Sequence, residues 1–455
     1  MNNLRKLLVF LIVSCLLVAC GGNASPTVDE TQAPPAQKET TAPAVAESKD
    51  YAGQLELAMS SDTAKQEVTV KAFVDGDTVH FHVPESVMAD GVLKARFLAI
   101  NTPESTGKIE EYGKAAAAFT REKLSTAESV IIESETAEWN PDSTGDRYLT
   151  WVWYKRAEDA AYRNLNVELL QNGLAIANGA GGNRYGTTCL AAIEQAKREK
   201  QNIYSGQPDP GFYYGDAVEL TLKELRTNVT AYEGMKVAFN GTVTTNSGTQ
   251  GVYVEDYDAE TDMYCGMYIY YGHGLSATGL DILSVGNAVR IVGSVQYYEA
   301  GGTWQVSDLS YRMMKPDDPG NIQKFSEGNS PAWVLTDPET FVNGTVTVRS
   351  ETAEQEMPYA QFALGTSVEM RGLKVQEIYT TDREGASSNG AMTLLCDADG
   401  IAVTVRTAPL LDETGNRITA DAYLGKTIDV RGIVDLFDGA YQIKVFAAKN
   451  ITINE

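Results

Sequence analysis

The chain has 455 residues, of which 43% are hydrophobic and 22% are charged. This length suits about three domains of ordinary size, and the composition is typical of folded domains and excludes a fibrous or wholly disordered chain. The 37 Lys and Arg residues stand against 61 Asp and Glu residues, which gives a net charge of −24. Because attraction to phosphates normally comes from clustered Lys and Arg, this charge argues against a generic basic nucleic-acid-binding protein.

Residues 1–19 have the pattern of a targeting segment. Arg5 and Lys6 precede an apolar run at 7–19 that is too short to span a bilayer, so a signal peptide is expected. The run ends in Leu-Val-Ala followed by Cys20 and two glycines, which resembles the lipobox of bacterial lipoproteins. The resemblance implies cleavage before Cys20 and its lipidation, with stable anchoring at the extracellular face of the cell membrane. The alternative is ordinary secretion, with Cys20 as an incidental residue of the run.

Residues 20–66 are expected to form a flexible tether after the lipidated cysteine. Their many Pro, Thr, Ala and Glu residues leave too little apolar surface for a core. The later cysteines, Cys189, Cys265 and Cys396, are odd in number and far apart. The sequence therefore predicts neither a disulfide framework nor a zinc site, and stability is expected to come from packed cores.

A first folded domain is expected at 67–206. Alternating apolar residues predict two strands within 67–83, joined by the Asp-Gly-Asp-Thr turn at 75–78, and a third strand at 93–100. An alanine-rich helix is predicted near 112–124, and the remaining expected elements are strands near 130–133 and 148–154 and helices near 166–172 and 189–200.

Six short motifs in this domain occur in one order along the chain. They are Val-Asp-Gly-Asp-Thr-Val at 74–79, Arg-Phe-Leu-Ala-Ile-Asn-Thr-Pro-Glu at 96–104, Tyr-Gly-Lys-Ala-Ala at 112–116, Asp-Arg-Tyr-Leu at 146–149, Asn-Gly-Leu-Ala at 172–175 and Ala-Lys-Arg-Glu-Lys-Gln-Asn-Ile-Tyr at 196–204. Together they resemble the staphylococcal nuclease (thermonuclease) family. The resemblance implies an OB-type barrel of five strands packed with three helices, in agreement with the predicted elements.

The resemblance also implies a calcium site. Hydrolysis of a phosphodiester needs an activated water, a cation and fixed donors for the phosphate. By resemblance, Asp77, the Asn101 side chain and the Thr102 carbonyl hold a Ca²⁺ ion, which prefers hard oxygen ligands. Glu104 is assigned a contact to the ion through water and the role of general base.

Two arginines match the phosphate-clamping residues of the family. Arg96 and Arg147 carry the guanidinium forks that suit phosphate oxygens. Taken singly, each site residue has a simpler interpretation: Asp77 closes a turn, Arg96 is an edge-strand charge, and Glu104 is a solvated residue after a proline. Their occurrence together at the family's spacing favours the catalytic interpretation.

The chain departs from the family's best-known members at three places. Asn101 stands where a second calcium-binding Asp is usual, so weaker or altered cation binding is expected. Residues 144–146 replace a Lys-Tyr-Gly stretch, and the glycine-rich segment 178–182 replaces an aromatic pair. Tyr185 is a candidate substrate-binding residue that stacks on a base in their place, or else an ordinary loop aromatic.

The second half of the chain contains an internal repeat after a Pro- and Gly-containing linker at 207–211. The segment 286–295 is repeated at 425–434, and Val237, Phe239 and Gly241 correspond to Val368, Met370 and Gly372. The period-two alternation predicts two β-barrel modules that resemble OB-fold domains, at 216–318 and 332–455. The overall fold class is therefore mainly β with α: a barrel with three helices, followed by two OB-like barrels.

The charge is unevenly distributed between the halves. Residues 67–206 have 15 Lys and Arg against 20 Asp and Glu, whereas residues from 207 onward have 17 against 34. OB barrels bind oligonucleotides or oligosaccharides, but the acidity of this half favours packing over stacking as the role of its aromatics. The aromatic residues concerned are Tyr253, Tyr268, Tyr270, Tyr271, Tyr297, Tyr298 and Trp304.

The sequence thus predicts a surface-anchored, Ca²⁺-dependent nuclease that cleaves extracellular DNA and RNA with little sequence preference. By resemblance it leaves 3′-phosphate ends, and no obligate protein partner is predicted. The alternative is a non-catalytic lipoprotein that binds nucleic acid, glycan or protein through a degenerate nuclease domain and the OB-like modules.

Overall fold

The computed structural model describes residues 47–248, 250–275, 277–349, 354–382 and 386–454. The predicted signal peptide, the lipidation site Cys20 and the tether up to residue 46 lie outside the described residues. The chain from Lys49 onward forms one compact unit by its contacts. Within the described ranges, none of the helices combines the length and apolar character needed to cross a membrane.

Residues 49–66 pack on the first barrel, so the predicted extension of the tether to residue 66 is wrong. The backbone N–H of Lys49 donates to Gln195 Oε1 at 2.9 Å, and Arg163 forms two hydrogen bonds with Asp50 at 2.7 and 2.8 Å. Ala52 is fully buried in the core. Few apolar residues suffice here because long-range hydrogen bonds and an ion pair hold the segment.

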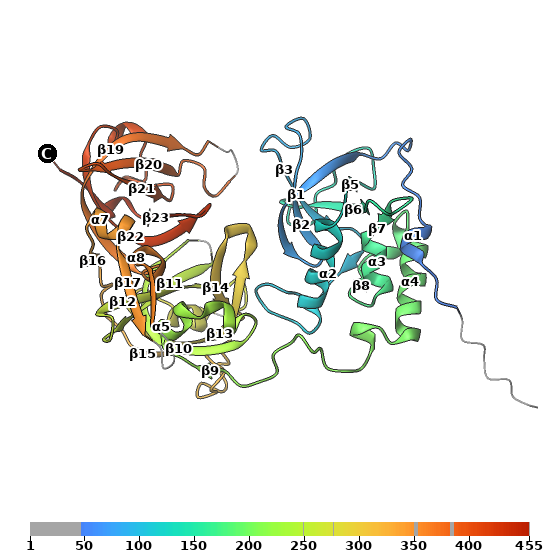
Figure 1. The fold of residues 1–455 in the computed structure, drawn as a ribbon, viewed down its shortest axis with the longest axis horizontal. Helices are drawn as coiled ribbons and strands as arrows, with labels where there is room; N and C mark the ends of the chain where they lie inside the picture. Colours follow the sequence, from blue (N-terminus) through green and yellow to red (C-terminus); the bar gives the residue numbers. More distant parts are fainter. Residues whose placement is uncertain (1–46, 249, 276, 350–353, 383–385, 455) are drawn as a thin grey trace, which may run out of the picture. The chain divides into compact units, whose positions relative to one another are not determined.

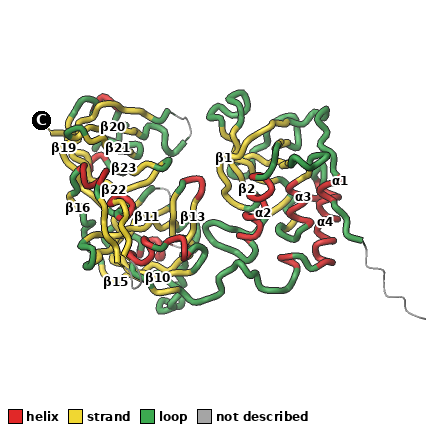
Figure 2. The backbone as a smooth tube through the Cα atoms, viewed as in Figure 1, coloured by secondary structure: helices red, strands yellow, loops and turns green. Residues whose placement is uncertain are grey.

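The first barrel closes through five strands in the order β1, β2, β3, β6 and β5 (Figure 1). All neighbours are antiparallel except β3 and β6, which are parallel. Helices α1 to α4 gather around this barrel (Figure 2). The elements are α1 (Tyr51–Gln54), β1 (Lys65–Asp75), β2 (Thr78–His82), β3 (Val92–Phe97), β4 (Ile100–Asn101), α2 (Gly113–Ser125), β5 (Ser129–Glu133), β6 (Tyr148–Lys155), β7 (Arg163–Asn164), α3 (Leu165–Gln171), β8 (Ile176–Ala177), η1 (Ala180–Gly182), α4 (Gly186–Glu199) and η2 (Asn202–Tyr204).

One buried side chain ties a helix to the parallel strand pair. Asn166, near the start of α3, donates to the carbonyls of Leu98 and Thr150 at 2.9 and 3.0 Å. Its own carbonyl accepts from the N–H of Val152 at 2.9 Å. Since a buried amide is costly unless satisfied, these three bonds specify how α3 sits against β6 and the end of β3. This fixes the strand ends that carry the candidate site.

The second barrel has the same strand circuit as the first. Strands β10, β11, β12, β14 and β13 close on one another, and β12 and β14 form the parallel pair. The elements of this region are β9 (Val218–Glu219), α5 (Leu222–Thr227), η3 (Val229–Tyr232), β10 (Lys236–Asn246), β11 (Gly251–Asp258), β12 (Met263–Tyr270), α6 (Ala277–Ile282), β13 (Ala288–Tyr298), η4 (Glu299–Gly301), β14 (Thr303–Ser307) and β15 (Gln323–Ser326).

The third barrel repeats the circuit through β19, β20, β21, β23 and β22, with β21 and β23 parallel. The hairpin β17–β18 packs apolar residues against the core of the second barrel. The elements are β16 (Val334–Leu335), α7 (Pro338–Asn343), β17 (Thr345–Arg349), β18 (Glu354–Pro358), α8 (Tyr359–Phe362), β19 (Ser367–Thr380), β20 (Met392–Ala398), β21 (Ile401–Thr407), η5 (Ala420–Ala422), β22 (Thr427–Phe437), β23 (Ala440–Val445), η6 (Ala448–Asn450) and β24 (Ile451–Asn454).

The internal repeat predicted from sequence is present in the strand register. Val237 lies opposite Gly293 in the second barrel, and the corresponding Val368 lies opposite Gly432 in the third. At both glycines, an added Cβ would overlap a carbonyl of the neighbouring strand. The repeated Gly therefore permits the close strand approach at a barrel corner. The mainly β fold class with closed five-stranded barrels is confirmed.

The second and third barrels share a polar contact. Glu255 is buried, and its carboxylate accepts from the N–H of Ala332 at 2.8 Å and from the N–H and hydroxyl of Ser367 at 2.7 and 2.9 Å. Burial raises the pKa of Glu255. Because leaving such a carboxylate without donors would be costly, these bonds specify the packing of the two barrels.

Candidate active site

The predicted site residues come from four segments that meet at the end of the first barrel. Asp77 lies in the turn between β1 and β2, and Arg96 is on β3 directly opposite Thr78. Arg147 immediately precedes β6, where Tyr148 lies opposite Ala95 of β3. Asn101 is the last residue of β4, and the loop that follows supplies Thr102 and Glu104. Barrel closure thus brings together residues up to 70 positions apart, from 77 to 147.

Asp77 is the buried centre of this arrangement. Its side chain is fully buried and accepts from the N–H of Thr102 at 2.8 Å and the hydroxyl of Thr78 at 3.1 Å. The Arg96 guanidinium donates both to Asp77 Oδ1 and to the side-chain Oδ1 of Asn101. Burial, together with the nearby charge of Arg147, lowers the pKa of Arg96. Two oxygens that were predicted to bind a cation therefore already converge on one positive group.

Glu104 has an environment that suits a general base. Loss of solvent, a hydrogen bond with Asp75 and the charge of Asp75 raise the pKa of Glu104 to about 7, against the opposing effect of Arg96. A carboxyl group with a pKa near neutrality can both take up and release a proton under physiological conditions. The perturbed carboxyl interacts with Arg96, which is itself near Arg147, and such a cluster is typical of a functional site.

Asp75 belongs to this cluster, although sequence analysis treated it only as a turn residue. It is buried, and its Oδ1 accepts from the N–H of Gly76 at 2.8 Å and from the hydroxyl and N–H of Ser105 at 2.8 and 3.1 Å. No local signal identifies it, because its partner Ser105 is 30 positions away in the chain.

Arg147 is held by a neighbouring carboxylate. Its Nε and Nη2 atoms donate to Asp142 Oδ2 at 2.8 and 2.7 Å, and about a third of its side chain (35%) is exposed. Although burial opposes the effect, hydrogen bonds from Thr144 and Arg147 lower the pKa of Asp142. The arginine is therefore oriented from one side and retains donors for an incoming anion.

Tyr185 lies in a different cluster from the arginines. Its hydroxyl donates to Glu133 at 3.3 Å, and its ring packs edge-on against Trp151 and Trp153, with centroids 5.0 and 5.5 Å apart. Burial and the charge of Glu133 raise the pKa of Tyr185. These contacts give the ring a packing role, and its predicted role in stacking on a base stays a prediction.

The aromatic residues of the second barrel divide into two groups. Tyr253 is 6% exposed and contacts Phe446 of the third barrel, and Trp304 packs against the core of its own barrel. Tyr297 and Tyr298 are 43% and 37% exposed, respectively. The packing interpretation therefore holds for some of these residues, and the two exposed tyrosines at the β13–β14 turn remain available to a partner.

The donor chemistry at Asp77 fits a calcium ion with few carboxylate ligands. Within the described part of the chain, no group of three or more His, Cys, Asp or Glu side chains is placed to hold a metal. A cation here would thus depend on the Asn101 amide and the Thr102 carbonyl besides Asp77, which are oxygen ligands that Ca²⁺ accepts. The Thr102 hydroxyl is buried and has no hydrogen-bond partner, which leaves a further oxygen at the same place.

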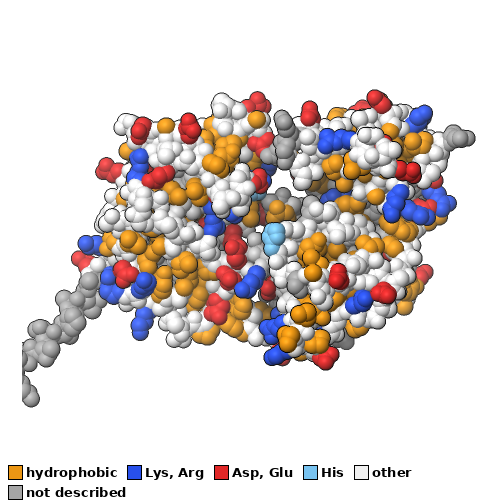
Figure 3. All heavy atoms as spheres, turned by 180° about the vertical axis from the view of Figure 1, so that it is seen from behind, with side chains coloured by type: hydrophobic (Ala, Val, Ile, Leu, Met, Phe, Trp, Pro, Cys, Tyr) orange, Lys and Arg blue, Asp and Glu red, His pale blue; other side chains and the backbone are white. Residues whose placement is uncertain are grey.

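The face drawn in Figure 3 shows no broad basic platform. On the face drawn in Figure 3, Lys and Arg side chains are interspersed with Asp and Glu rather than gathered over one element. On this face, attraction of an anion would therefore depend on individual basic side chains.

These features define an OB-type β-barrel domain with a cluster of carboxylate and arginine side chains at one end. The comparison with protein families assigns this domain: residues 94–206 match the family described as staphylococcal nuclease homologue. The chain therefore contains a domain of that family, which supports a nuclease-type, nucleic-acid-binding hydrolase at the family level. A search of curated proteins found no match to the chain.

Proposed function

We propose that this protein is a calcium-dependent nuclease that hydrolyses DNA and RNA with little sequence preference and leaves 3′-phosphate ends. The observation that carries the proposal is the convergence of Arg96, Arg147 and a Glu104 carboxyl of raised pKa around the buried Asp77. A general base, two phosphate donors and a cation site are the components that phosphodiester hydrolysis needs.

Each residue has a role in the proposed reaction. Glu104 takes a proton from the attacking water, while Arg96 and Arg147 bind the phosphate oxygens and offset the charge that develops on them. The water oxygen forms a bond to phosphorus as the bond from phosphorus to the 5′ oxygen breaks, and the leaving 5′ oxygen takes up a proton from solvent water. Bound Ca²⁺ would be held by Asp77, Asn101 and the Thr102 carbonyl, and it would supply positive charge next to the phosphate.

The cell-surface location is a separate part of the proposal. It rests on the lipobox-like sequence at Cys20 and the preceding apolar run. A lipid anchor would place the nuclease at the extracellular face of the membrane, where it meets extracellular nucleic acid. Metabolic labelling with a fatty acid tests this part directly: incorporation that is lost in Cys20→Ala is expected, and label that persists in this variant would contradict it.

The enzymatic part is tested with the mature protein on plasmid DNA and on RNA. We expect cleavage with calcium, none with a chelator, and little with Glu104→Gln, which keeps the shape of the side chain but cannot accept a proton. A matched control is Glu122→Gln, because Glu122 is exposed on α2 and pairs with Lys123 at 3.2 Å, away from Glu104. Equal cleavage by wild type and Glu104→Gln would contradict the assignment of the base.

One observation favours the second candidate, a non-catalytic binding lipoprotein. Both arginines are engaged by side chains of the chain itself, Arg96 by Asp77 and Asn101 and Arg147 by Asp142. In this alternative the domain binds nucleic acid without cleaving it. Binding of a labelled oligonucleotide by the wild-type protein, with calcium present and no cleavage over hours, would support it over the nuclease.

A further inference from the structure

The second barrel contacts the loop that carries Glu104. This loop, residues 102–112, connects β4 to α2, and its midpoint is Gly107. The N–H of Gly107 donates to Gln296 Oε1 at 3.0 Å, and Gln296 Nε2 donates to the Gly107 carbonyl at 3.2 Å. Gln296 is on β13 and is 4% exposed. One side-chain amide therefore satisfies both polar groups of one loop residue, as a neighbouring strand would.

The same loop is held at two other places. Ser105 is bonded through its N–H and hydroxyl to Asp75 in the first barrel. At the other end, the N–H of Tyr112 donates to Asp209 in the linker at 2.6 Å. Between these anchors, Ile109 is the buried apolar residue of the segment, at 8% exposure. With so little apolar burial, the position of the middle of the loop depends on the two bonds to Gln296.

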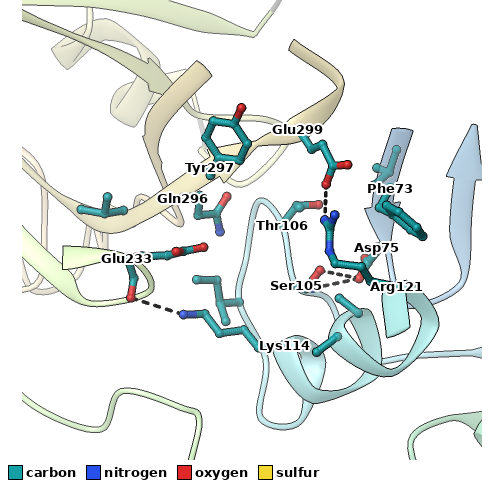
Figure 4. Close-up of a pocket in the computed structure, with 15 residues that line it drawn as sticks. Phe73, Asp75, Ser105, Thr106, Lys114, Arg121, Glu233, Gln296, Tyr297 and Glu299 are labelled. Atoms are coloured by element: carbon teal, nitrogen blue, oxygen red, sulfur yellow. Dashed lines mark hydrogen bonds and ion pairs between the residues drawn. The ribbon is translucent and has the colours of Figure 1, made fainter. Parts of the chain in front are cut away.

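Two flanking contacts extend the interface along α2. Arg121 forms an ion pair with Glu299, and Lys114 Nζ donates to the Glu233 carbonyl at 3.4 Å (Figure 4). A cavity of about 240 Å³ lies between these contacts and is also lined by Asp75 and Tyr297. The interface therefore borders the carboxylate that bonds and perturbs Glu104.

In the third barrel, the residue equivalent to Gln296 has different partners. The repeat aligns Gly293 with Gly432, so Gln296 corresponds to Asp435 three residues further on. Asp435 accepts from Gln442 of its own barrel at 2.8 Å. The equivalent strand position thus bonds Gln442 of its own barrel and Tyr253 of the second barrel in one case, and reaches the Glu104 loop in the other.

We propose that Gln296 is a positioning residue for the nuclease site, so that the second barrel holds the Glu104 loop in its working conformation. The inference rests on the proposed function, because positioning matters only if Glu104 acts on a substrate. This proposal gives the C-terminal half a role in turnover. The negative charge of that half does not oppose the role, because the second barrel contacts the first barrel and not a phosphate backbone.

The test compares Gln296→Ala with Gln442→Ala in the full mature chain. Gln442 is a matched control because it is also a buried barrel glutamine with a side-chain hydrogen bond. For Gln296→Ala we expect kcat to fall by about tenfold or more with KM changed less than about twofold, because misplacing a catalytic group costs rate more than binding. Gln296→Glu keeps an acceptor for the Gly107 N–H but loses the donor, so its kcat should lie between those of the wild type and Gln296→Ala.

Hydrogen exchange of residues 102–112 provides a readout that needs no activity. We expect faster exchange in this loop in Gln296→Ala, no change in Gln442→Ala, and unchanged exchange in the strands of both variants. Unchanged loop exchange, or faster exchange with an unaltered kcat, would overturn the proposal. If the wild-type protein cleaves nothing, the proposed nuclease function fails, while the exchange result still decides whether Gln296 holds the loop.

Discussion

Replacing Arg96 with Met should change activity, stability and calcium affinity in three different ways. Methionine keeps an unbranched apolar stem of similar length but removes the guanidinium that bonds Asp77 and Asn101. The Arg96 side chain is 15% exposed, so the stem has neighbours to pack against and the substitution leaves little empty space. The three effects can therefore be read separately.

The size of each effect follows from the contacts. Losing one positioned donor to the reacting phosphate should lower kcat by about 100- to 1,000-fold. Asp77 keeps its bonds from Thr102 and Thr78, so unfolding free energy should fall by only about 1–3 kcal/mol. A single charge and a divalent ion about 5 Å apart in water repel by about 1.7 kcal/mol, so calcium binding should tighten roughly 15-fold.

The assay pairs cleavage of a fluorogenic oligonucleotide with calorimetric calcium titration and urea unfolding of the same preparations. Arg156→Met is the control, because this arginine pairs with Asp159 at 3.2 Å on the surface and has no contact with the site. Calcium affinity that weakens in Arg96→Met, or activity within about tenfold of wild type, would refute the reasoning. Weaker calcium affinity would mean that Arg96 does not repel a cation at Asp77 and Asn101. Near-normal activity would mean that Arg96 does not bind the reacting phosphate.

Three further outcomes are expected. Glu104 must be ionised to act as a base and its pKa is about 7, so activity at low calcium should rise with pH through about 7. Saturating calcium should move this rise in activity to lower pH, because the ion favours the ionised carboxylate. A pH-independent rate from about pH 5 to 9 would contradict the role of Glu104. Asn101→Asp adds a negative charge to the ligand set and should tighten calcium binding by about tenfold in the same titration, whereas an unchanged affinity would remove Asn101 from that set. Gly113→Ala places a Cβ against the carbonyl of Glu104, so it should lower the free energy of urea unfolding by about 1–3 kcal/mol and lower activity. Gly181→Ala meets nothing within 4 Å and should change neither property. Equal stability of the two variants would contradict the close approach at Gly113.

The barrel strands and main helices were predictable because their signals are local. Period-two alternation marked β1, β2 and β3, and an alanine-rich stretch marked α2, which the structure begins at Gly113. The repeat in the second half was predictable for the same reason, since a glycine at the close strand contact recurs at positions 293 and 432. Patterns of this kind depend on a few neighbouring residues and therefore survive in a single sequence.

The parts that sequence analysis missed depend on long-range polar contacts. Residues 49–66 looked like the end of a tether, but the bond from the Lys49 N–H to Gln195 and the bond from Arg163 to Asp50 show that the segment from residue 49 is packed. Asp75 looked like a turn residue until Ser105, 30 positions away, was seen to bond it. Gln296 gave no signal, because its partner Gly107 is 189 positions earlier in the chain. No local pattern records such pairings.

The central claim is tested most directly by quantitative cleavage of plasmid DNA by the mature wild-type protein and by Glu104→Gln, each with calcium and with a chelator. The account predicts calcium-dependent cleavage by the wild type, new ends that carry 3′-phosphates, and a rate at least about 100-fold lower for Glu104→Gln. Cleavage that persists with the chelator, ends that carry 5′-phosphates, or equal rates for the two proteins would contradict it.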